Sequence, residues 1–172
     1  VAIEPAVAPM KHRLIGGRFV AGDESGDAYK FTAELARLCI AKGVQFDFGV
    51  SIESLESKGG KISGIRTKAG KSITADAYVL ALGSYSPLLA RPLGIDLPIY
   101  PLKGYSVTMP VKNPAAAWTV SLSDEAHKLV LSRLGDRLRI AGTAELNGYN
   151  TEINKVRCEA IVRRTMELFP DA

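Results

Sequence analysis

A glycine at the end of an apolar run is the first feature of this 172-residue sequence that could serve chemistry. Residues 77–82 are continuously apolar and Gly83 ends the run, a pattern typical of a β-strand buried on both faces. Because Gly83 has no Cβ, the backbone there can turn sharply or approach a ligand closely. Ser86 and Pro87 are then predicted as the N-cap and first residue of a helix over 87–91. Open α/β sheets bind ligands at such a corner, although an ordinary strand–turn–helix connection would look the same.

A second glycine, Gly104, interrupts a long predicted strand over residues 99–110, which also contains Pro101. Proline cannot donate a hydrogen bond to a sheet, and glycine inside a strand marks a bulge or a close approach of the backbone. We therefore expect this strand to cross from one lobe of the protein to another.

The sequence offers no familiar catalytic set. His12 and His127 stand without an HExxH motif or a neighbouring cysteine, so we interpret both as surface or hydrogen-bonded residues rather than ligands. Cys39 and Cys158 follow no metal-binding or redox spacing, and we expect reduced thiols in a cytosolic protein. We therefore predict no metal site and leave the catalytic residues unassigned.

Composition and charge narrow the classes of function. The chain is 47% hydrophobic and 23% charged, which is typical of a soluble globular protein. Its net charge of +4 is spread along the chain, without the interleaved aromatic residues of a protein that binds single-stranded nucleic acid. The longest apolar runs are too short to span a bilayer. Nucleic acid is therefore not an expected partner.

The first half of the chain predicts a mixed α/β lobe. A short edge strand over 14–20 precedes a helix over 28–42, which Asp27 caps and Gly43 ends. Residues 44–50 alternate between apolar and polar, which predicts a strand. Because this strand follows a helix and a short turn, we expect it to lie parallel to the apolar strand over 77–82, which ends at Gly83.

The remaining elements predict two antiparallel sheets and a final helix. Regularly spaced glycine turns indicate a meander with strands over residues 52–57, 62–67 and 71–75. A second sheet has its predicted strands over residues 99–110, 118–122, 128–133 and 137–144. The final helix, over 152–169 and starting at Asn150-Thr151, carries apolar residues on two opposite faces, as in a helix packed between neighbours.

Five segments, in this order, carry a resemblance to a known enzyme family. They are Gly22-Asp-Glu-Ser-Gly-Asp27, Phe31-Thr-Ala-Glu-Leu-Ala-Arg37, Ala75-Asp-Ala-Tyr-Val-Leu-Ala-Leu-Gly-Ser-Tyr-Ser86, Ile99-Tyr-Pro-Leu-Lys-Gly-Tyr-Ser106 and Arg137-Leu-Arg-Ile-Ala-Gly-Thr-Ala-Glu145. With this order and spacing, the chain resembles the flavoenzymes of the D-amino acid oxidase and glycine oxidase family, above all those that dehydrogenate D-amino acids. The resemblance covers nearly the whole chain.

The resemblance implies an α+β or α/β protein of two lobes. One is a Rossmann-like FAD-binding lobe with an inserted β-meander, and the other is a substrate lobe built on an antiparallel sheet. Residues 1–27 would be a connector with an edge strand, 28–98 part of the FAD-binding lobe, and 99–172 the substrate-binding lobe. Because the chain begins without methionine in a proline-containing stretch and stops just after a helix, we expect a fragment truncated at both ends.

The resemblance also implies positions for the cofactor and the substrate. The expected cofactor-binding residues are Val50, beside the adenine, then Ala81, Leu82, Gly83 and Ser84, and finally Gly104, near the flavin. Lys103 and Tyr105 would contribute to the substrate pocket. Members of the family place the arginine that binds the substrate carboxylate after position 172.

The implied reaction is oxidation of a D-amino acid by hydride transfer to the flavin, followed by hydrolysis to a 2-oxo acid and ammonia. FAD would carry the oxidation, and the protein would supply orientation and charge. The electron acceptor would be a quinone. The full protein would be cytoplasmic, with peripheral association at the inner face of the inner membrane.

Two other functions remain open. The chain could belong to a related flavoenzyme acting on glycine, sarcosine or proline, or it could be a non-catalytic α/β binding domain.

The sequence departs from the family in one respect. It contains no Gly-x-Gly-x-x-Gly motif, which in the family seats the FAD pyrophosphate on a helix N-terminus. We therefore expect the chain alone to bind FAD weakly or not at all and to be inactive.

Overall fold

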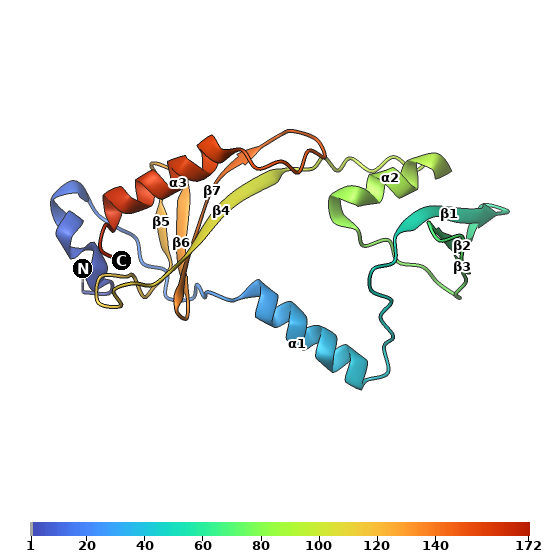
Figure 1. The fold of residues 1–172 in the computed structure, drawn as a ribbon, viewed down its shortest axis with the longest axis horizontal. Coiled ribbons are helices and arrows are strands. Elements are labelled where there is room, and N and C mark those ends of the chain that lie inside the picture. The colour runs from blue at the N-terminus through green and yellow to red at the C-terminus, as the bar shows by residue number, and fades with distance from the viewer. Residues whose placement is uncertain (1) are drawn as a thin grey trace. The chain divides into compact units, whose positions relative to one another are not determined.

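The computed structural model describes residues 2–172, which divide into two units. The first contains the residues up to Leu35 together with Leu102–Ala172, and the second contains Ala36–Pro101 (Figure 1). The first boundary falls inside helix α1 (Ala28–Ala41), and the second falls just before strand β4 (Lys103–Pro110). The chain therefore passes between the units twice.

An antiparallel sheet of four strands forms the first unit, as predicted. The strands are β4, β5 (Leu122–Asp124), β6 (Leu129–Leu134) and β7 (Arg137–Glu145), in the order β4-β7-β6-β5. The β4 strand begins four residues later than predicted, after Pro101. The β5 strand begins at Leu122, the last residue of its predicted range, so the prediction of a strand over residues 118–121 is wrong. Gly135, with φ of +69°, lies in the tight turn between β6 and β7.

Helix α3 (Lys155–Leu168) packs along one face of this sheet (Figure 1). The Asn154 side chain caps it by accepting a hydrogen bond from the Val156 N–H at 3.1 Å, so the helix begins later than the predicted Asn150-Thr151. The core beneath it consists of Met10, Tyr105, Ala117, Trp118, Leu129, Leu131, Leu138, Ile140, Ile161 and Phe169. The predicted second apolar face has no neighbour within the described residues, because Val156 and Met166 are exposed.

The N-terminal segment packs against the first unit. Residues Pro5–Arg13 form a 3-10 helix, and Met10 enters the core with 6% of its surface exposed. Glu4 lies just before this helix, and its carboxylate accepts hydrogen bonds from the Thr119 N–H at 2.6 Å and the Val120 N–H at 2.9 Å. A buried acidic side chain therefore holds the start of the described chain against the segment that leads into β5.

The predicted edge strand over residues 14–20 is wrong. These residues form no strand, and Ile15 and Phe19 are exposed. A strand needs a neighbour for its backbone hydrogen bonds, and no described strand pairs with this segment. Short apolar runs interrupted by glycine do not reveal whether such a neighbour exists.

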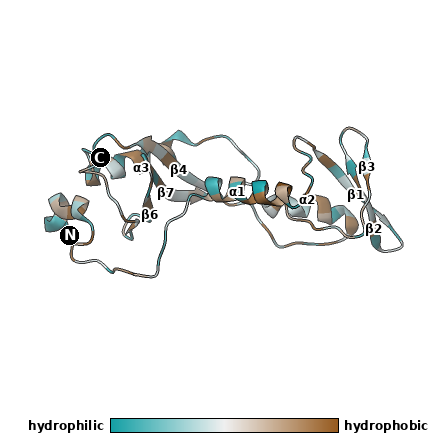
Figure 2. Ribbon diagram, turned by 90° about the horizontal axis from the view of Figure 1, so that it is seen from below, coloured by the Kyte–Doolittle hydropathy of each residue, from teal (hydrophilic) through white to brown (hydrophobic). Residues whose placement is uncertain are grey.

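Both predicted caps of α1 are confirmed. The Asp27 carboxylate accepts hydrogen bonds from the Tyr29 N–H at 3.0 Å and the Lys30 N–H at 3.2 Å. At the other end, Gly43 has φ of +89°, and the Val44 N–H bonds to the Cys39 carbonyl at 3.0 Å, as in a Schellman motif. None of the helix residues is buried, and its apolar residues Phe31, Leu35 and Leu38 are exposed. The ribbon of α1 is brown at its apolar positions in Figure 2.

The second unit contains the predicted three-stranded meander. Its strands are β1 (Ile52–Lys58), β2 (Lys61–Thr67) and the short β3 (Ser72–Ile73), all antiparallel. The short helix α2 (Ser86–Ala90) lies against β1, with 3-10 turns at Gly83–Tyr85 and Arg91–Leu93 on either side. This unit carries most of the positions predicted to bind the cofactor.

The strands predicted over 44–50 and 77–82 are wrong as secondary structure. Neither segment forms a strand, and every strand pair of the described residues is antiparallel. Phe46 and Phe48 stack on one side of the first segment with ring centroids 5.5 Å apart, so the alternation predicts the direction of these side chains correctly. What is missing is the adjacent strand that a parallel sheet requires.

Candidate functional site

The turn at Gly83 has the geometry that its glycine predicts. Gly83 adopts φ of +53°, which strains a residue with a side chain. The Ser86 hydroxyl accepts a hydrogen bond from the Leu82 N–H at 3.1 Å and so closes the turn. The predicted role of Ser86 as N-cap is wrong, because Ser86 is already helical and Tyr85 occupies the cap position. Of the residues predicted to contact the cofactor, Ala81, Leu82 and Gly83 are exposed and Ser84 is half-buried.

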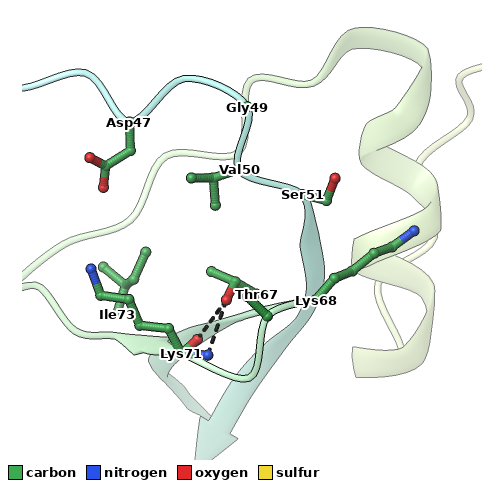
Figure 3. Close-up of a pocket in the computed structure, with 9 residues that line it drawn as sticks. Asp47, Gly49, Val50, Ser51, Thr67, Lys68, Lys71 and Ile73 are labelled. Carbon is green, nitrogen blue, oxygen red and sulfur yellow. Dashed lines mark hydrogen bonds between the residues drawn. The ribbon is translucent and has the colours of Figure 1, made fainter.

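Val50 lines a cavity of about 310 Å³ within the second unit (Figure 3). Its walls come from the segment before β1 and from the β2–β3 turn, and comprise Asp47, Gly49, Val50, Ser51, Thr67, Lys68, Ala69, Lys71 and Ile73. The Thr67 hydroxyl fixes the turn, because it accepts from the Lys71 N–H at 3.1 Å and donates to the Lys71 carbonyl at 3.2 Å. Val50 was predicted from the sequence as a cofactor-binding residue, whereas the other residues that line this cavity were not.

The cavity fits one end of a dinucleotide cofactor in size and chemistry. Small-molecule sites in proteins have volumes of about 300–1,000 Å³, so this cavity is at the lower end of the range. Val50 and Ile73 offer apolar surface to a flat base, and the ammonium group of Lys71 can attract phosphate, whereas the Lys68 side chain points away from Val50 and Ile73 in Figure 3. The adenosine end of FAD is therefore compatible with these residues.

The predicted irregularity at Gly104 is confirmed. The pairing of β4 with β7 shifts register between Gly104 and Ser106, which is a β-bulge. A Cβ built on Gly104 would meet no atom of the described residues within 4 Å. The backbone at Gly104 is therefore open to close approach by a flat ligand.

Lys103 and Tyr105, the predicted substrate residues, meet at the carboxylate of Glu145 on β7. The Lys103 ammonium lies 2.6 Å and the Tyr105 hydroxyl 2.8 Å from Oε1 of this carboxylate. On its other oxygen the carboxylate accepts from Nε of Arg157, at 3.0 Å. The Asn154 N–H donates to the Tyr105 oxygen at 3.3 Å. These five residues, here called the Glu145 cluster, connect β4 and β7 to the start of α3.

The electrostatics of this cluster favour its charged state. The ammonium of Lys103 and the hydroxyl of Tyr105 both donate to Glu145, and together with Arg157 they lower the pKa of its carboxyl from 4.5 to about 2. The hydrogen bond with Glu145 in turn raises the pKa of Lys103 above its ordinary value. Lys103 also donates to the carbonyls of Asn150 and Glu152, at 3.0 and 2.8 Å, so it anchors the loop before α3 as well.

Sequence reasoning missed Glu145 and Arg157. Glu145 ends a strand and Arg157 lies in a helix, and neither position is marked by a local motif. The only available signal is that an acidic residue closes the segment Arg137–Glu145, one of the five segments of the family resemblance. The predicted site residues also belong to different units: Val50 and residues 81–84 to the second, and Lys103, Gly104 and Tyr105 to the first.

The two histidines lie in different surroundings within the described residues. His127 bonds to Asp124 through Nδ1, at 3.1 Å from Oδ2, and His12 is exposed in the first 3-10 helix. Residues 2–172 contain no group of three or more His, Cys, Asp or Glu side chains that could hold a metal ion.

Comparison with known families matches residues 1–172 to the family described as FAD dependent oxidoreductase. The chain belongs to this family. The FAD dependent oxidoreductase assignment agrees with the fold, with the openness of Gly83 and Gly104, and with the cavity beside Val50.

Two curated relatives with the same name match almost the whole chain. The chain is 54% identical to a D-amino acid dehydrogenase of Dechloromonas aromatica, over 98% of this chain and 41% of the relative. It is 55% identical to a D-amino acid dehydrogenase of Paramagnetospirillum magneticum, over 99% of this chain and 40% of the relative. The chain thus spans about 40% of the length of these relatives.

Two solved structures share the fold at low identity. A glycine oxidase from Geobacillus kaustophilus matches with a TM-score of 0.69 and 21% identity, over 84% of this chain and 38% of that one. An L-proline dehydrogenase from P. horikoshii matches with a TM-score of 0.69 and 17% identity, over 83% and 39%. At these identities the likeness supports the mixed α/β fold class and carries no information on substrate.

Proposed function

We propose that the chain is the central part of an FAD-dependent dehydrogenase that oxidises D-amino acids to 2-oxo acids and ammonia. The observation that carries the proposal is the identity of 54–55% to proteins named D-amino acid dehydrogenase, over nearly the whole chain. Bound FAD would supply the hydride acceptor for oxidation at the substrate Cα, and hydrolysis of the resulting imino acid would release the 2-oxo acid and ammonia.

The residues of this chain would bind and orient the two molecules. Val50 and Lys71 support binding of the adenosine end, and Gly83 and Gly104, taken separately, each leave backbone open to a flat ring. The Glu145 cluster would hold the strand that carries Gly104. Lys103 and Tyr105 would then shape the substrate pocket through the position of β4, since their polar atoms are already bonded to Glu145.

We further propose a quinone as the electron acceptor, with the protein at the cytoplasmic face of the inner membrane. The relatives are named dehydrogenases rather than oxidases, which favours an acceptor other than oxygen. None of the helices in residues 2–172 has the length and hydropathy needed to cross a membrane. Oxygen uptake compared with reduction of a water-soluble quinone would test the acceptor.

A substrate panel tests the proposed function against its alternative. Full-length protein is incubated with an artificial electron acceptor and with D-amino acids, their L-enantiomers, glycine, sarcosine or proline. The proposal expects 2-oxo acid and ammonia in equal amounts from D-amino acids alone. Turnover restricted to glycine, sarcosine or proline would establish the alternative flavoenzyme, and binding of FAD without any turnover would indicate a non-catalytic domain.

A further inference from the structure

The four-stranded sheet of the first unit has two faces of different chemistry. Helix α3 covers the face formed by Leu129, Leu131, Leu138 and Ile140, each of them at most 5% exposed. Side chains alternate along a strand, so the residues between these project from the opposite face. This opposite face, here called the polar face, carries Ser106, Thr108, Ser121, Val130, Ser132, Arg139 and Ala141.

Arg139 lies in a row of hydroxyl groups on the polar face. Cross-strand register places it directly beside Thr108 on β4 and Ser132 on β6. Its Nη1 donates to the Thr108 hydroxyl at 3.3 Å, and the Ser132 hydroxyl bonds to that of Ser121 at 2.9 Å. Hydroxyl groups orient a guanidinium but do not neutralise its charge.

The charge of Arg139 has no carboxylate partner within residues 2–172. The other arginines of β7 and α3 that reach this sheet are paired: Arg137 with Asp27 at 3.2 Å, Arg157 with Glu145 at 3.0 Å, and Arg164 with Asp124 at 2.8 Å. A guanidinium presents parallel N–H groups that match a carboxylate in bidentate fashion. Arg139 is therefore suited to bind a carboxylate from outside the described residues.

The next row on the polar face is short and partly apolar. Ala141 stands opposite Ser106 on β4 and Val130 on β6. These side chains project less far than that of Arg139, and Val130 is 47% exposed. An α-amino acid carries its carboxylate and its side chain on the same carbon. With its carboxylate at Arg139, a substrate can place an aliphatic side chain over this neighbouring row, at Ala141 and Val130.

We propose that the polar face is a wall of the substrate site, in which Arg139 binds the α-carboxylate and Ala141 and Val130 contact the substrate side chain. The inference rests on the proposed function and deepens it. The family resemblance places one carboxylate-binding arginine after position 172, so Arg139 provides a second cationic contact. It selects amino acids over amines that lack a carboxylate.

Kinetics of Arg139 variants in the full-length holoenzyme test this inference. R139M should raise KM for D-alanine about tenfold to a hundredfold, with a smaller change in kcat, because a charge-assisted contact to the carboxylate is lost. R139K should restore part of the affinity. Turnover of D-alaninol, which has no carboxylate, should change little. The matched control is R133M: Arg133 lies on β6 but bonds to the Gly135 carbonyl in the turn.

A binding measurement tests the inference in a variant that folds but oxidises D-alanine too slowly for kinetics. Propionate, a carboxylate without an amino group, is titrated against the oxidised holoenzyme, and the shift of the flavin spectrum is followed. Weaker propionate binding in R139K, at unchanged flavin content and Tm, supports the inference. Unchanged propionate affinity and unchanged KM in both variants would overturn it. If wild-type protein oxidises no D-amino acid, the proposed function itself fails, which is a separate outcome.

Discussion

The Tyr105 hydroxyl donates a hydrogen bond to the Glu145 carboxylate at 2.8 Å, across 40 residues of sequence. Tyr105 lies in the β-bulge that begins at Gly104, and Glu145 ends the neighbouring strand. The bond therefore fixes the bulge from the side that α3 covers. The position of the bulge and the charge of Glu145 therefore depend on residues of β4, β7 and α3.

Removing the Tyr105 hydroxyl should destabilise the first unit. In Y105F the Asn154 N–H loses its acceptor and Glu145 loses a donor, while the buried ring remains. Loss of a buried hydrogen bond costs about 1 kcal/mol of unfolding free energy. Denaturant unfolding of the 172-residue chain measures this loss. The control is Y29F, whose side chain is 81% exposed, and equal stability of the two variants would contradict the prediction.

Glu145 should make stability depend on pH in the acid range. Its pKa falls from 4.5 to about 2 on folding, so the stabilisation is present above pH 4.5 and is lost as pH falls toward 2. E145Q cannot ionise; it should be less stable at neutral pH and lose less stability over this window. Unfolding at a series of pH values measures both slopes. E125Q is the control, because the Glu125–Lys128 pair is exposed and contributes little. Parallel slopes for wild type and E145Q would contradict the assignment.

Glu4 should hold the N-terminal segment over the only tryptophan of the chain. E4A leaves the N–H groups of Thr119 and Val120 without their acceptor, at a cost of about 1–3 kcal/mol of unfolding free energy. Trp118 is fully buried against Phe169, at 4.8 Å between ring centroids, so its fluorescence should shift to the red if the segment detaches. E24A, at an exposed position, serves as the control. Unchanged emission and stability in E4A would show that the contact contributes nothing.

Two glycines of the same sheet should respond differently to alanine. In G142A the new Cβ would collide with Leu129 and lie 3.3 Å from Ile161, which should cost about 1–3 kcal/mol of unfolding free energy. In G104A the Cβ meets nothing within 4 Å, so folding should be unaffected. If the cofactor approaches Gly104, however, G104A should weaken FAD binding in the full-length protein. Normal FAD affinity in G104A would remove Gly104 from the cofactor site.

The sequence correctly predicted elements whose hydrogen bonds join residues close to one another in the chain. Asp27 and Gly43 define the ends of α1 through bonds that span a few residues, and the meander follows from its glycine turns. Gly83 and Gly104 likewise indicate where the backbone is unusual, because conformation at a glycine is a local property.

Elements that need distant partners were not predictable in the same way. The alternation in residues 44–50 shows which side chains share a side, but a strand forms only where another strand pairs with it. The Glu145 cluster and the Glu4–Thr119 contact, which spans 115 residues, depend on the tertiary fold and leave no spacing in the sequence. The sequence therefore predicted Lys103 and Tyr105 of this cluster but not the Glu145 and Arg157 side chains that bond to one another within it.

The central claim is that this chain belongs to an enzyme in which a D-amino acid reduces bound FAD. The most direct test is anaerobic mixing of the full-length holoenzyme with D-alanine or L-alanine, followed by the visible absorbance of the flavin. The account predicts rapid bleaching with D-alanine and none with L-alanine. Equal bleaching by both enantiomers, bleaching by L-alanine alone, or a flavin that no amino acid reduces would contradict it.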